Sequence, residues 1–408
     1  MIFKFPISKI DKIILERFRD ILIKYNYTYD YFQTVKINPF AFTQFDLPLF
    51  AYRFPETLSF GILFHLFLLG AKLDKKIVGK IFDAEFTEQL LKIKILEKAG
   101  DNHIQSAVTI IPYQSFYFAA DFIFRLDNRQ NNKPKYEYVY PVSLDSITLC
   151  DALIKKSVNS VLDLGCGCGI LSLVASQFSK NVTGVDLNPR AVNFSRFNAL
   201  LNGIDNCEFL QGDLYRPIKE EKFDLILSNP PYEITPKKTY LYKDGGKYGY
   251  LILKRIMKDV SKHLKRNGFC QVINRIVQFN NEKREEVLKN WVAPDKLRIL
   301  FIELQKIDIY QYAYLISMDN LICEDKTLDY QKYSGKIVEL LDFFHKIHLT
   351  DTSLGIFNLT RDTRFTFTEQ NFDITHQSAA KLQNVIQMHF SSKILQILSY
   401  FYRRIFDS

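Results

Sequence analysis

The sequence predicts an α/β fold in which a doubly wound sheet of seven strands carries helices on both faces. The first observation is that short apolar runs and amphipathic segments alternate regularly between residues 160 and 320, as strands and helices do in such folds. The second is a glycine-rich turn directly after the first apolar run. The third is that a polar residue follows several of the later runs, where the carboxyl edge of a parallel sheet would lie.

The elements of this sheet are expected in a regular order. Pro189 begins one helix and Gly203 ends it, which is the usual placement of these two residues. The last two strands have no helix between them, so one is expected to be an antiparallel edge strand. The strands are expected within residues 160–167, 181–188, 207–213, 223–229, 268–276, 297–304 and 312–318, and the helices within 170–178, 189–203, 248–264 and 282–291.

The residues before this region follow a different pattern. Three segments with helical spacing, 56–70, 75–82 and 88–100, precede an alternating segment, 106–121, that predicts a β-hairpin. Three helices and a hairpin are typical of a winged-helix-like module. The polar stretch DNRQNNKPK, residues 127–135, is the best candidate for a linker.

We therefore predict three parts of the chain. A winged-helix-like α+β domain for substrate recognition is expected over residues 1–133, and the sheet that binds the ligand over 134–320. An extension over 321–408 ends in a strongly amphipathic segment, 381–406, which predicts a helix that docks on the rest of the protein.

Composition limits the class of protein. The chain has 408 residues, 47% hydrophobic and 24% charged, which is ordinary for a globular protein of more than one domain. Its net charge of +9 permits an acidic partner such as nucleic acid or an anionic membrane surface. The six cysteines lack framework spacing, and the longest apolar stretch, about residues 60–71, falls short of the roughly 20 residues that cross a bilayer. A cytoplasmic protein without a transmembrane segment is expected.

The glycine turn indicates a nucleotide-like ligand. In VLDLGCGCG, Asp163 precedes Gly165, Gly167 and Gly169 at a strand-to-helix turn, where glycines let the backbone approach a ligand closely. A dinucleotide fingerprint would require glycine or alanine at the position of Ile170. The Asp163 carboxylate also disfavours a pyrophosphate and favours a cationic amino group. The ligand that suits this turn is S-adenosylmethionine.

Two further carboxylates follow the next strands. Asp186 lies 21 residues after Gly165, where an acid accepts hydrogen bonds from ribose hydroxyls. Asp213 ends the third strand, where it could meet an adenine amino group. With the adjoining Leu187 and Leu214, these residues are the expected cofactor contacts. A single aspartate at a strand end is usually a helix cap, but three in succession favour a ligand site.

The segment NPPY at residues 229–232 ends the fourth strand with an amide, two rigid rings and an aromatic side chain. The Asn229 side chain can accept a hydrogen bond from a substrate N–H, and the Pro230 carbonyl, fixed by the rings of Pro230 and Pro231, can accept another. Two such acceptors would hold a planar –NH₂ group with its lone pair aimed at a methyl donor, and Tyr232 would stack on the acceptor. The alternative is an ordinary Asx-Pro turn.

These motifs closely resemble the class I S-adenosylmethionine-dependent methyltransferases with an Asn-Pro-Pro-Tyr motif. The resemblance covers about residues 136–320 and is strongest to the "small domain" group, which includes release-factor glutamine N5-methyltransferases and ribosomal RNA guanine N2-methyltransferases. Residues 140–153 resemble the segment that these enzymes fold over the cofactor, which implies that Asp145 and Ser146 also bind it. Residues 63–74 and 109–121 resemble, more loosely, the winged-helix-like front end of some bacterial members.

The expected function is transfer of a methyl group to a planar amide or exocyclic amino nitrogen, with S-adenosyl-L-methionine as cofactor. A macromolecular acceptor, a protein glutamine or a nucleobase of RNA, is favoured over a small molecule or a peptide. The Lys- and Tyr-rich segment 235–250 could bind single-stranded RNA or be a solvated lid. The remaining alternative is a nucleic-acid-binding protein that senses the cofactor. No metal site is expected, because Cys166 and Cys168 have no partner pair with ligand spacing.

Overall fold

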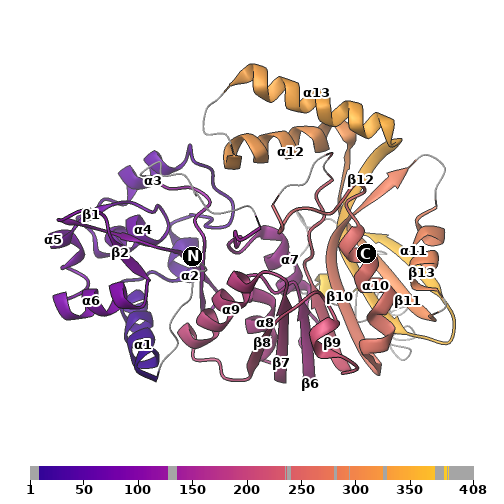
Figure 1. Cartoon of the computed structure of the whole chain (residues 1–408), viewed down its shortest axis with the longest axis horizontal. Helices are drawn as coiled ribbons and strands as arrows, with labels where there is room; N and C mark the ends of the chain where they lie inside the picture. The colour runs from indigo at the N-terminus through magenta and orange to yellow at the C-terminus, as the bar shows by residue number, and fades with distance from the viewer. Residues whose placement is uncertain are drawn as a thin grey trace, which may run out of the picture.

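The computed structural model shows a front α+β region packed beside one edge of a large sheet (Figure 1). The predicted linker, 127–135, and most of the predicted terminal helix, 381–406, lie outside the residues that the structure describes. The described residues are 9–126, 136–234, 236, 240–279, 283–293, 295–324, 329–372, 381–383 and 385.

The large sheet has eight strands in the order β13-β11-β12-β10-β9-β6-β7-β8. The pairs among β6 to β10 are parallel, and β12 runs antiparallel to both of its neighbours, β10 and β11. The sheet is therefore mixed and has one strand more than the seven predicted. The bounds are β6 (Val158–Leu164), β7 (Ser179–Asp186), β8 (Cys207–Gln211), β9 (Phe223–Ser228), β10 (Leu264–Phe279), β11 (Leu297–Asp308), β12 (Leu349–Arg361) and β13 (Thr366–Asn371).

The predicted strand at 312–318 is wrong, because these residues lie in helix α12 (Ile309–Glu324). Tyr312, Ala313 and Ile316 are buried together, at helical rather than alternating spacing. Every second residue of this segment is apolar, but so are Ala313 and Leu315 between them, and such a run does not distinguish a strand from a helix. The antiparallel strand is instead β12, which lies inside the sheet and comes from the extension after residue 320.

Helices cover both faces of the sheet, as the doubly wound prediction requires. Alternate residues of β6, such as Val161 and Leu162, enter two different hydrophobic clusters. The first cluster contains α7 (Leu144–Ala152), α8 (Ile170–Ser176) and α9 (Pro189–Leu201), and the second contains α10 (Leu251–His263) and α11 (Arg284–Val292). Because the strands are buried on both faces, their sequences are nearly continuous apolar runs.

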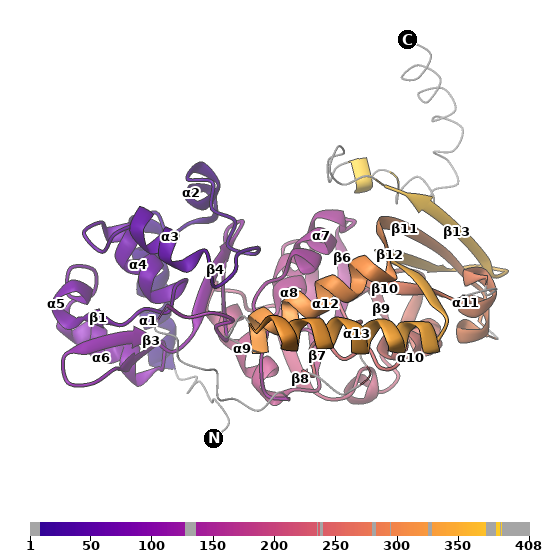
Figure 2. The same ribbon diagram turned by 90° about the horizontal axis from the view of Figure 1, so that it is seen from above.

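Two helices, of which only the second lies wholly in the predicted extension, form a pair between β11 and β12. Helices α12 and α13 (Tyr330–Lys346) lie side by side in both views (Figures 1 and 2). Phe344 of α13 stacks on Tyr312 of α12 with ring centroids 5.6 Å apart. The same cluster contains Ile234, which follows the NPPYE segment directly. The extension therefore reaches the region of the predicted acceptor site.

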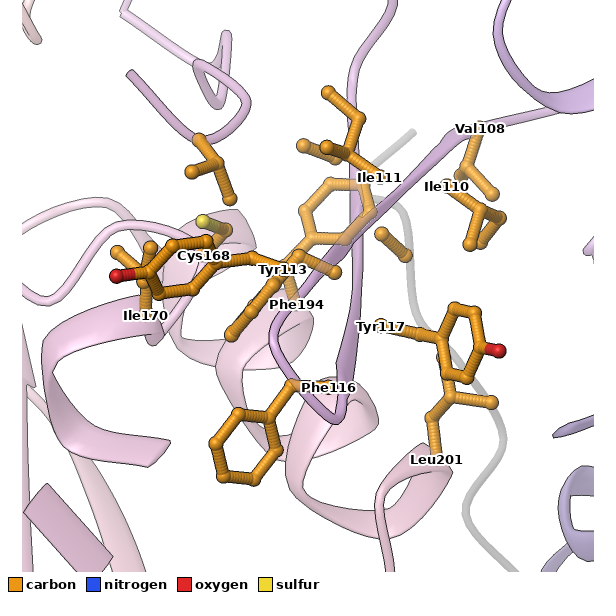
Figure 3. Close-up of a cluster of buried hydrophobic side chains, with 14 of the residues drawn as sticks. Val108, Ile110, Ile111, Tyr113, Phe116, Tyr117, Cys168, Ile170, Phe194 and Leu201 are labelled. Atoms are coloured by element: carbon orange, nitrogen blue, oxygen red, sulfur yellow. The ribbon is translucent and has the colours of Figure 1, made fainter. Parts of the chain in front are cut away.

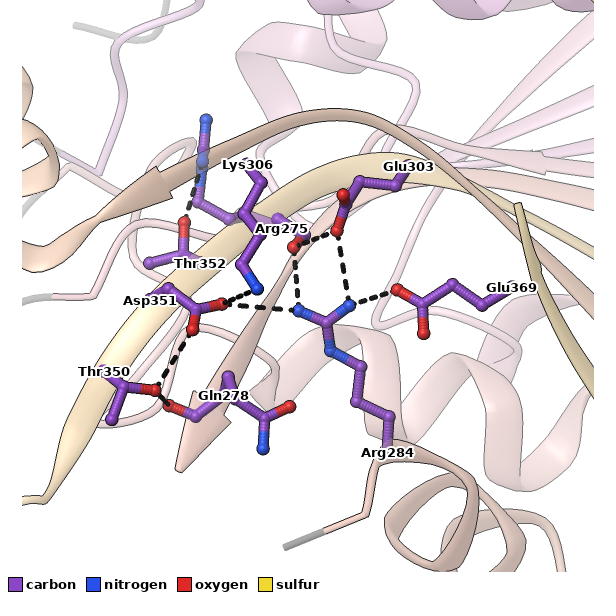
Figure 4. Close-up of polar contacts among 10 residues, drawn as sticks. Arg275, Gln278, Arg284, Glu303, Lys306, Thr350, Asp351, Thr352 and Glu369 are labelled. Carbon is purple, nitrogen blue, oxygen red and sulfur yellow. Dashed lines mark hydrogen bonds and ion pairs between the residues drawn. The ribbon is translucent and has the colours of Figure 1, made fainter. Parts of the chain in front are cut away.

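The far end of the sheet is held by a cluster of charged residues around Arg284 (Figure 4). Its guanidinium lies 3.4 Å from Glu303 of β11 and 3.7 Å from Asp351 of β12, and it also pairs with Glu369 of β13. Lys306 lies 3.4 Å from the same Asp351 carboxylate. The guanidinium is largely buried, so its charge requires these partners. They join α11 to three strands and fix β13 on the sheet.

The front region contains the predicted hairpin, β4 (Thr109–Tyr113) with β5 (Phe116–Ala120). A separate three-stranded sheet has the order β1-β3-β2. The three predicted helical segments contain or overlap α4, α5 and α6. The remaining elements are α1 (Lys9–Lys24), α2 (Tyr29–Thr34), α3 (Leu47–Arg53), α4 (Ser59–Phe67), β1 (Leu73–Asp74), α5 (Lys75–Val78), α6 (Ala84–Lys92), β2 (Leu96–Lys98) and β3 (His103–Ser106).

Two asparagines one helical turn apart on α9 attach the hairpin to the large sheet. Asn202 accepts from the Tyr117 N–H and donates to its carbonyl, both at 2.8 Å. Asn198 pairs in the same way with Ala119, at 2.8 and 3.0 Å, and also donates to the carbonyl of Cys168 at 2.8 Å. Asn198 is fully buried, so this one side chain joins the hairpin to the glycine turn.

Apolar packing strengthens the same contact. Tyr113 of the hairpin lies beside Phe194 of α9, Cys168 of the glycine turn and Ile170 at the start of α8 (Figure 3). These residues belong to one hydrophobic cluster that extends from the front helices into the large sheet. Removing the front region would expose this surface and remove the hairpin partners of Asn198 and Asn202. The experiments below therefore use the full chain.

Candidate active site

A cavity of about 380 Å³ lies at the carboxyl ends of β6, β7 and β9. Asp163 and Gly169 are absent from its lining, although both were predicted to bind the cofactor. The other predicted residues all line it. They are Asp145, Ser146, Gly165, Gly167, Asp186, Leu187, Asp213, Leu214, Asn229, Pro230, Pro231 and Tyr232.

The glycine turn leaves room for a ligand beside the backbone. Gly165 and Gly167 have φ values of +73° and +58°, which side chains rarely adopt. A Cβ atom added at either position would meet no atom within 4 Å. The N–H of Gly165 donates to the Val185 carbonyl at 2.7 Å, which fixes the turn against the end of β7. The turn thus presents bare backbone to the cavity, as close approach of a nucleoside requires.

Asp186 ends β7 and is held by two backbone donors. The Gly167 N–H donates to its Oδ2 at 2.9 Å and the Asn188 N–H to its Oδ1 at 2.8 Å. Burial raises the pKa of this carboxyl, and the two N–H donors oppose that rise. Each oxygen retains lone-pair capacity because a carboxylate accepts about four hydrogen bonds. The geometry therefore suits a pair of ribose hydroxyls.

Asp163 lies behind the glycine turn rather than at the cavity surface. Its side chain is fully buried, and its Oδ2 accepts from the Ser172 hydroxyl at 2.6 Å. Burial raises the pKa of this carboxyl to about 7. The acid is therefore close to half-protonated at neutral pH, and any influence on a cationic ligand acts through the turn.

The raised pKa of Asp163 predicts a pH-dependent stability. Between about pH 4 and pH 7 the folded protein holds a proton that an ordinary unfolded aspartate has lost, so the free energy of unfolding falls as pH rises through this window. Asp163→Asn keeps an acceptor for Ser172 and removes the titration. As pH rises from about 5 to about 7.5, we expect the free energy of unfolding of the variant to increase by at least about 1 kcal/mol relative to that of the parent.

Chemical denaturation of both proteins without ligand, at the two pH values, measures this difference. Comparing the variant with the parent cancels groups that titrate equally in both. Ser172→Ala serves as a control, because it removes the hydrogen bond but leaves the carboxyl to titrate. A stability difference between Asp163→Asn and the parent that is independent of pH would show that Asp163 keeps an ordinary pKa.

Asp213 is paired with a residue that the sequence did not single out. Both of its carboxylate oxygens accept from Nη2 of Arg255, at 2.8 and 2.7 Å, and Arg255 also lines the cavity. Arg255 lies on the polar side of the amphipathic helix α10, where basic residues are common, so its sequence position gave no signal. An adenine amino group at Asp213 would therefore lie near a guanidinium.

The predicted elbow at residues 229–232 is held by the first turn of α7. The Asn229 Nδ2 donates to the Ser146 hydroxyl at 3.0 Å. Ser143, the N-cap of α7, accepts from the Ser146 N–H at 3.2 Å and lies 3.1 Å from its hydroxyl. The Asn229 Oδ1 accepts no hydrogen bond from any residue that the structure describes. The amide is thus oriented with its oxygen available to a ligand.

Tyr232 and Asp145 form the second contact between the same two segments. The Tyr232 hydroxyl donates to Oδ2 of Asp145. Burial raises the pKa of both groups, and the hydrogen bond itself opposes the rise at Asp145. Ser146 and Asp145 are adjacent, so one helical turn orients both polar side chains of the elbow. The resemblance implied that these two residues bind the cofactor, whereas their observed partners are Asn229 and Tyr232.

The segment after the elbow folds over the cavity. Tyr242 packs against Tyr138 and Tyr140 with ring centroids 5.5 and 4.7 Å apart. Lys243 is buried, and its Nζ lies 3.9 Å from the Glu233 carboxylate. Of the two alternatives for this segment, the inward contacts of Tyr242 and Lys243 favour a lid over a surface that binds single-stranded RNA. Lys247 of the same segment is exposed. Lys237 and Lys238 lie outside the described residues.

Helix α12 fixes the residue that follows NPPYE. The Ile234 N–H donates to the Tyr312 hydroxyl at 3.1 Å, and the Arg275 guanidinium lies 5.2 Å from the centre of the Tyr312 ring. Both Ile234 and Tyr312 are buried. The elbow is therefore supported from α7 at one end and from α12 at the other. Tyr312 gave no sequence signal because its segment was assigned to a strand.

Comparison with known proteins gives matches over the same region. A family model described as the methyltransferase small domain matches residues 143–294. The "Putative protein N5-glutamine methyltransferase" of Methanocaldococcus jannaschii is 38% identical over 142 residues, which are 33% of this chain and 71% of that protein. The release factor glutamine methyltransferase of Aliivibrio fischeri is 42% identical over 103 residues, 24% of this chain and 34% of that protein. An uncharacterized RNA methyltransferase of Clostridium tetani is 36% identical over 104 residues, 25% and 22% of the two chains.

An open cradle at the glycine turn, beside a strand-end carboxylate, suits a nucleoside ligand, and the three relatives named above are methyltransferases. The protein is an S-adenosylmethionine-dependent methyltransferase. It belongs to the methyltransferase small domain family, because the family model matches it and because it is 38% identical to the archaeal relative over 71% of that protein. The chain spans about a third of the length of the release factor enzyme, so the acceptor does not follow from that similarity.

The described residues include neither a membrane-spanning helix nor a metal-binding cluster. No helix in the described parts of the chain is both long and apolar enough to cross a bilayer. No group of three or more His, Cys, Asp or Glu residues in the same parts could hold a metal ion. Cys166 and Cys168 are buried, and burial raises the pKa of both thiols.

Proposed function

We propose that the protein methylates the side-chain amide nitrogen of a glutamine in a protein substrate. The observation that carries this proposal is the orientation of Asn229. Its Nδ2 donates to Ser146 at 3.0 Å, and its Oδ1 has no described donor. A carbonyl oxygen held at the cavity surface is the acceptor that a planar –NH₂ group needs. A thiol or hydroxyl acceptor has a single hydrogen to donate, so it would not require both this oxygen and the carbonyl oxygen of Pro230.

The residues of the chain position the two reactants. The glycine turn, Asp186 and Asp213 would hold the nucleoside, and the oxygens of Asn229 and Pro230 would each accept one N–H of the acceptor amide. When bound, S-adenosylmethionine supplies an electrophilic methyl group. Transfer would form a bond between that methyl carbon and the amide nitrogen, break the sulfur–carbon bond to leave S-adenosylhomocysteine, and release one N–H proton to water. Positioning of this kind can supply a large part of the rate.

A glutamine is favoured over a nucleobase for two reasons. The archaeal relative is named for a protein glutamine reaction, and this chain spans 71% of it. Lys243 pairs inside the fold instead of facing outward, so it does not supply the positive charge on which RNA affinity depends. Tyr232 can still stack on a flat group of either kind.

We also propose that the front region recognises the substrate as a winged-helix-like domain. Its order of elements supports this. A helix (α4) is followed by a short strand (β1), two helices (α5 and α6) and a two-stranded wing (β2 and β3), and β1 completes the small sheet. The contacts of Asn198 with both the hairpin and the Cys168 carbonyl support a close link to the cofactor site.

Transfer of a radioactive methyl group to an extract from cells that lack the enzyme tests the acceptor. We expect the label to survive RNase, to be lost on protease treatment, and to map by mass spectrometry to the side-chain nitrogen of glutamine. Asn229→Ala protein in the same extract controls for other methyltransferases. Label that is released by RNase would instead assign a nucleobase as the acceptor, and label in neither polymer would assign a metabolite.

A further inference from the structure

A second cavity, of about 400 Å³, lies between the front region and the segment that leads into α7. Phe42 and Phe124 form one side of it, with ring centroids 5.9 Å apart. Leu144, at the start of α7, lines it from the large sheet. A volume of this order is enough to enclose a small ligand or several side chains. We call this cavity the front groove.

The front groove shares a wall with the active-site cavity. Tyr140 and Pro141 line both cavities. Three residues further on, Leu144 lines the front groove, and the adjacent Asp145 lines the active site and binds Tyr232. An acceptor that enters the active site is therefore within reach of the groove if it extends beyond its methylated group.

The front groove is apolar and open to solvent. None of its described lining residues carries a charge. Ala41 is exposed, Phe40 and Phe42 are half-buried, and Leu144 is 48% exposed. Phe45, at the end of the same loop, is 52% exposed. Contiguous apolar surface that is left exposed on a folded protein commonly marks a binding site.

We propose that the front groove binds apolar side chains of the polypeptide segment next to the methylated glutamine. This inference rests on the proposed function, because it assumes a protein acceptor in the adjacent cavity. An RNA segment would bring phosphates to a groove whose described lining contains no lysine or arginine, which removes the main source of nucleic-acid affinity. Apolar side chains of an extended peptide would instead remove the exposed surface of Ala41 and Leu144 from water.

Ala41 offers a substitution that removes no packing, because its side chain is small and exposed. Ala41→Glu and Ala41→Lys both place a charge in the groove, and burying a charge against apolar side chains is unfavourable whatever its sign. Both variants should therefore weaken an apolar peptide. Ala84 is an exposed alanine at the start of α6, away from the groove. Ala84→Glu and Ala84→Lys are the matched controls.

The probes are two fluorescent heptapeptides centred on glutamine and a fluorescent oligouridylate. The first peptide is Leu-Phe-Ala-Gln-Ala-Phe-Leu, and the second has serine in place of Leu and Phe. Anisotropy titrations use the full chain saturated with S-adenosylhomocysteine, and calorimetry with the same compound checks that each variant keeps its cofactor site. We expect the parent to bind the apolar peptide about tenfold or more tightly than the serine peptide.

Each Ala41 variant should bind the apolar peptide about fivefold or more weakly, and the Ala84 variants should match the parent. Equal binding of the two peptides, or unchanged binding in both Ala41 variants, would overturn the proposal. Tighter oligouridylate binding by Ala41→Lys and weaker binding by Ala41→Glu would assign the groove to nucleic acid.

Mass spectrometry of the apolar peptide after incubation with S-adenosylmethionine separates the two proposals. Groove-dependent binding without methylated glutamine would contradict the proposed function alone.

Discussion

Asn229→Ala is expected to lower kcat about a hundredfold or more, as the loss of a preorganised polar group in an active site typically does. The variant removes the oxygen that would accept from the acceptor amide, and it leaves the Ser146 hydroxyl without the donor that lies 3.0 Å away. The affinity for S-adenosylhomocysteine should change much less, because the proposed partner of the amide oxygen is the acceptor and not the cofactor. Initial rates at saturating cofactor, with the labelled protein fraction as acceptor, measure the first effect and calorimetry the second.

Asn229→Asp is the sharper variant. A carboxylate still accepts from the acceptor N–H, and the Ser146 hydroxyl can donate to its second oxygen, so partial activity is expected. Ser146→Ala provides the control for orientation, since it keeps the Asn229 amide but removes its anchor; kcat should fall by less than in Asn229→Ala. An Asn229→Ala enzyme with normal kcat and weakened cofactor binding would show that the elbow is a wall of the cofactor site.

The predicted residues that line the cavity follow a topological rule. Gly165, Asp186, Asp213 and Asn229 each come after an apolar run, and the carboxyl ends of parallel strands meet at one edge of a sheet. The pairing of β6 with β7 and β9 brings the ends of these strands together. Their placement therefore required only the strand assignments. Asp163 lies inside β6, one residue before its end, and its buried carboxylate accepts from Ser172 instead of lining the cavity.

Contacts between distant segments could not be predicted in the same way. Tyr232 was expected to use only its ring, yet its hydroxyl binds Asp145, 87 residues away. Ser143 and Ser146 gave a local signal, a helix cap three residues before a second hydroxyl, but nothing in the sequence directs that hydroxyl to Asn229. Such pairs depend on how α7 crosses the edge of the sheet, which no local pattern records.

The end of the sheet shows a different limit. The apolar run 312–318 is compatible with a strand or a helix, and its burial against α13 decides for the helix. The strand that pairs with both β10 and β11 lies beyond it, at Leu349–Arg361. The two helices between β11 and β12 separate strands that are adjacent in the sheet. Assigning strands in sequence order therefore placed the last strand at 312–318 and missed β12 and β13.

Asp186→Ala is expected to weaken binding of S-adenosylhomocysteine by about 2 kcal/mol, roughly thirtyfold, since hydrogen bonds to a charged group contribute about 1.5–3 kcal/mol. The variant removes the acceptors proposed for the ribose hydroxyls. It also releases the N–H groups of Gly167 and Asn188, which donate to the carboxylate at 2.9 and 2.8 Å. Part of the loss is therefore a less ordered glycine turn.

Asp186→Asn separates these two contributions. The amide keeps one acceptor for a backbone N–H and turns its –NH₂ toward the other, so the turn is disturbed at one contact only, and an intermediate affinity is expected. Asp205→Ala, which changes an exposed aspartate before β8, should bind the ligand like the parent. Calorimetry of the four proteins, with thermal unfolding to confirm that each is folded, gives the comparison. Unchanged affinity in folded Asp186→Ala would place the ribose elsewhere, because no ligand held by this carboxylate could tolerate its removal.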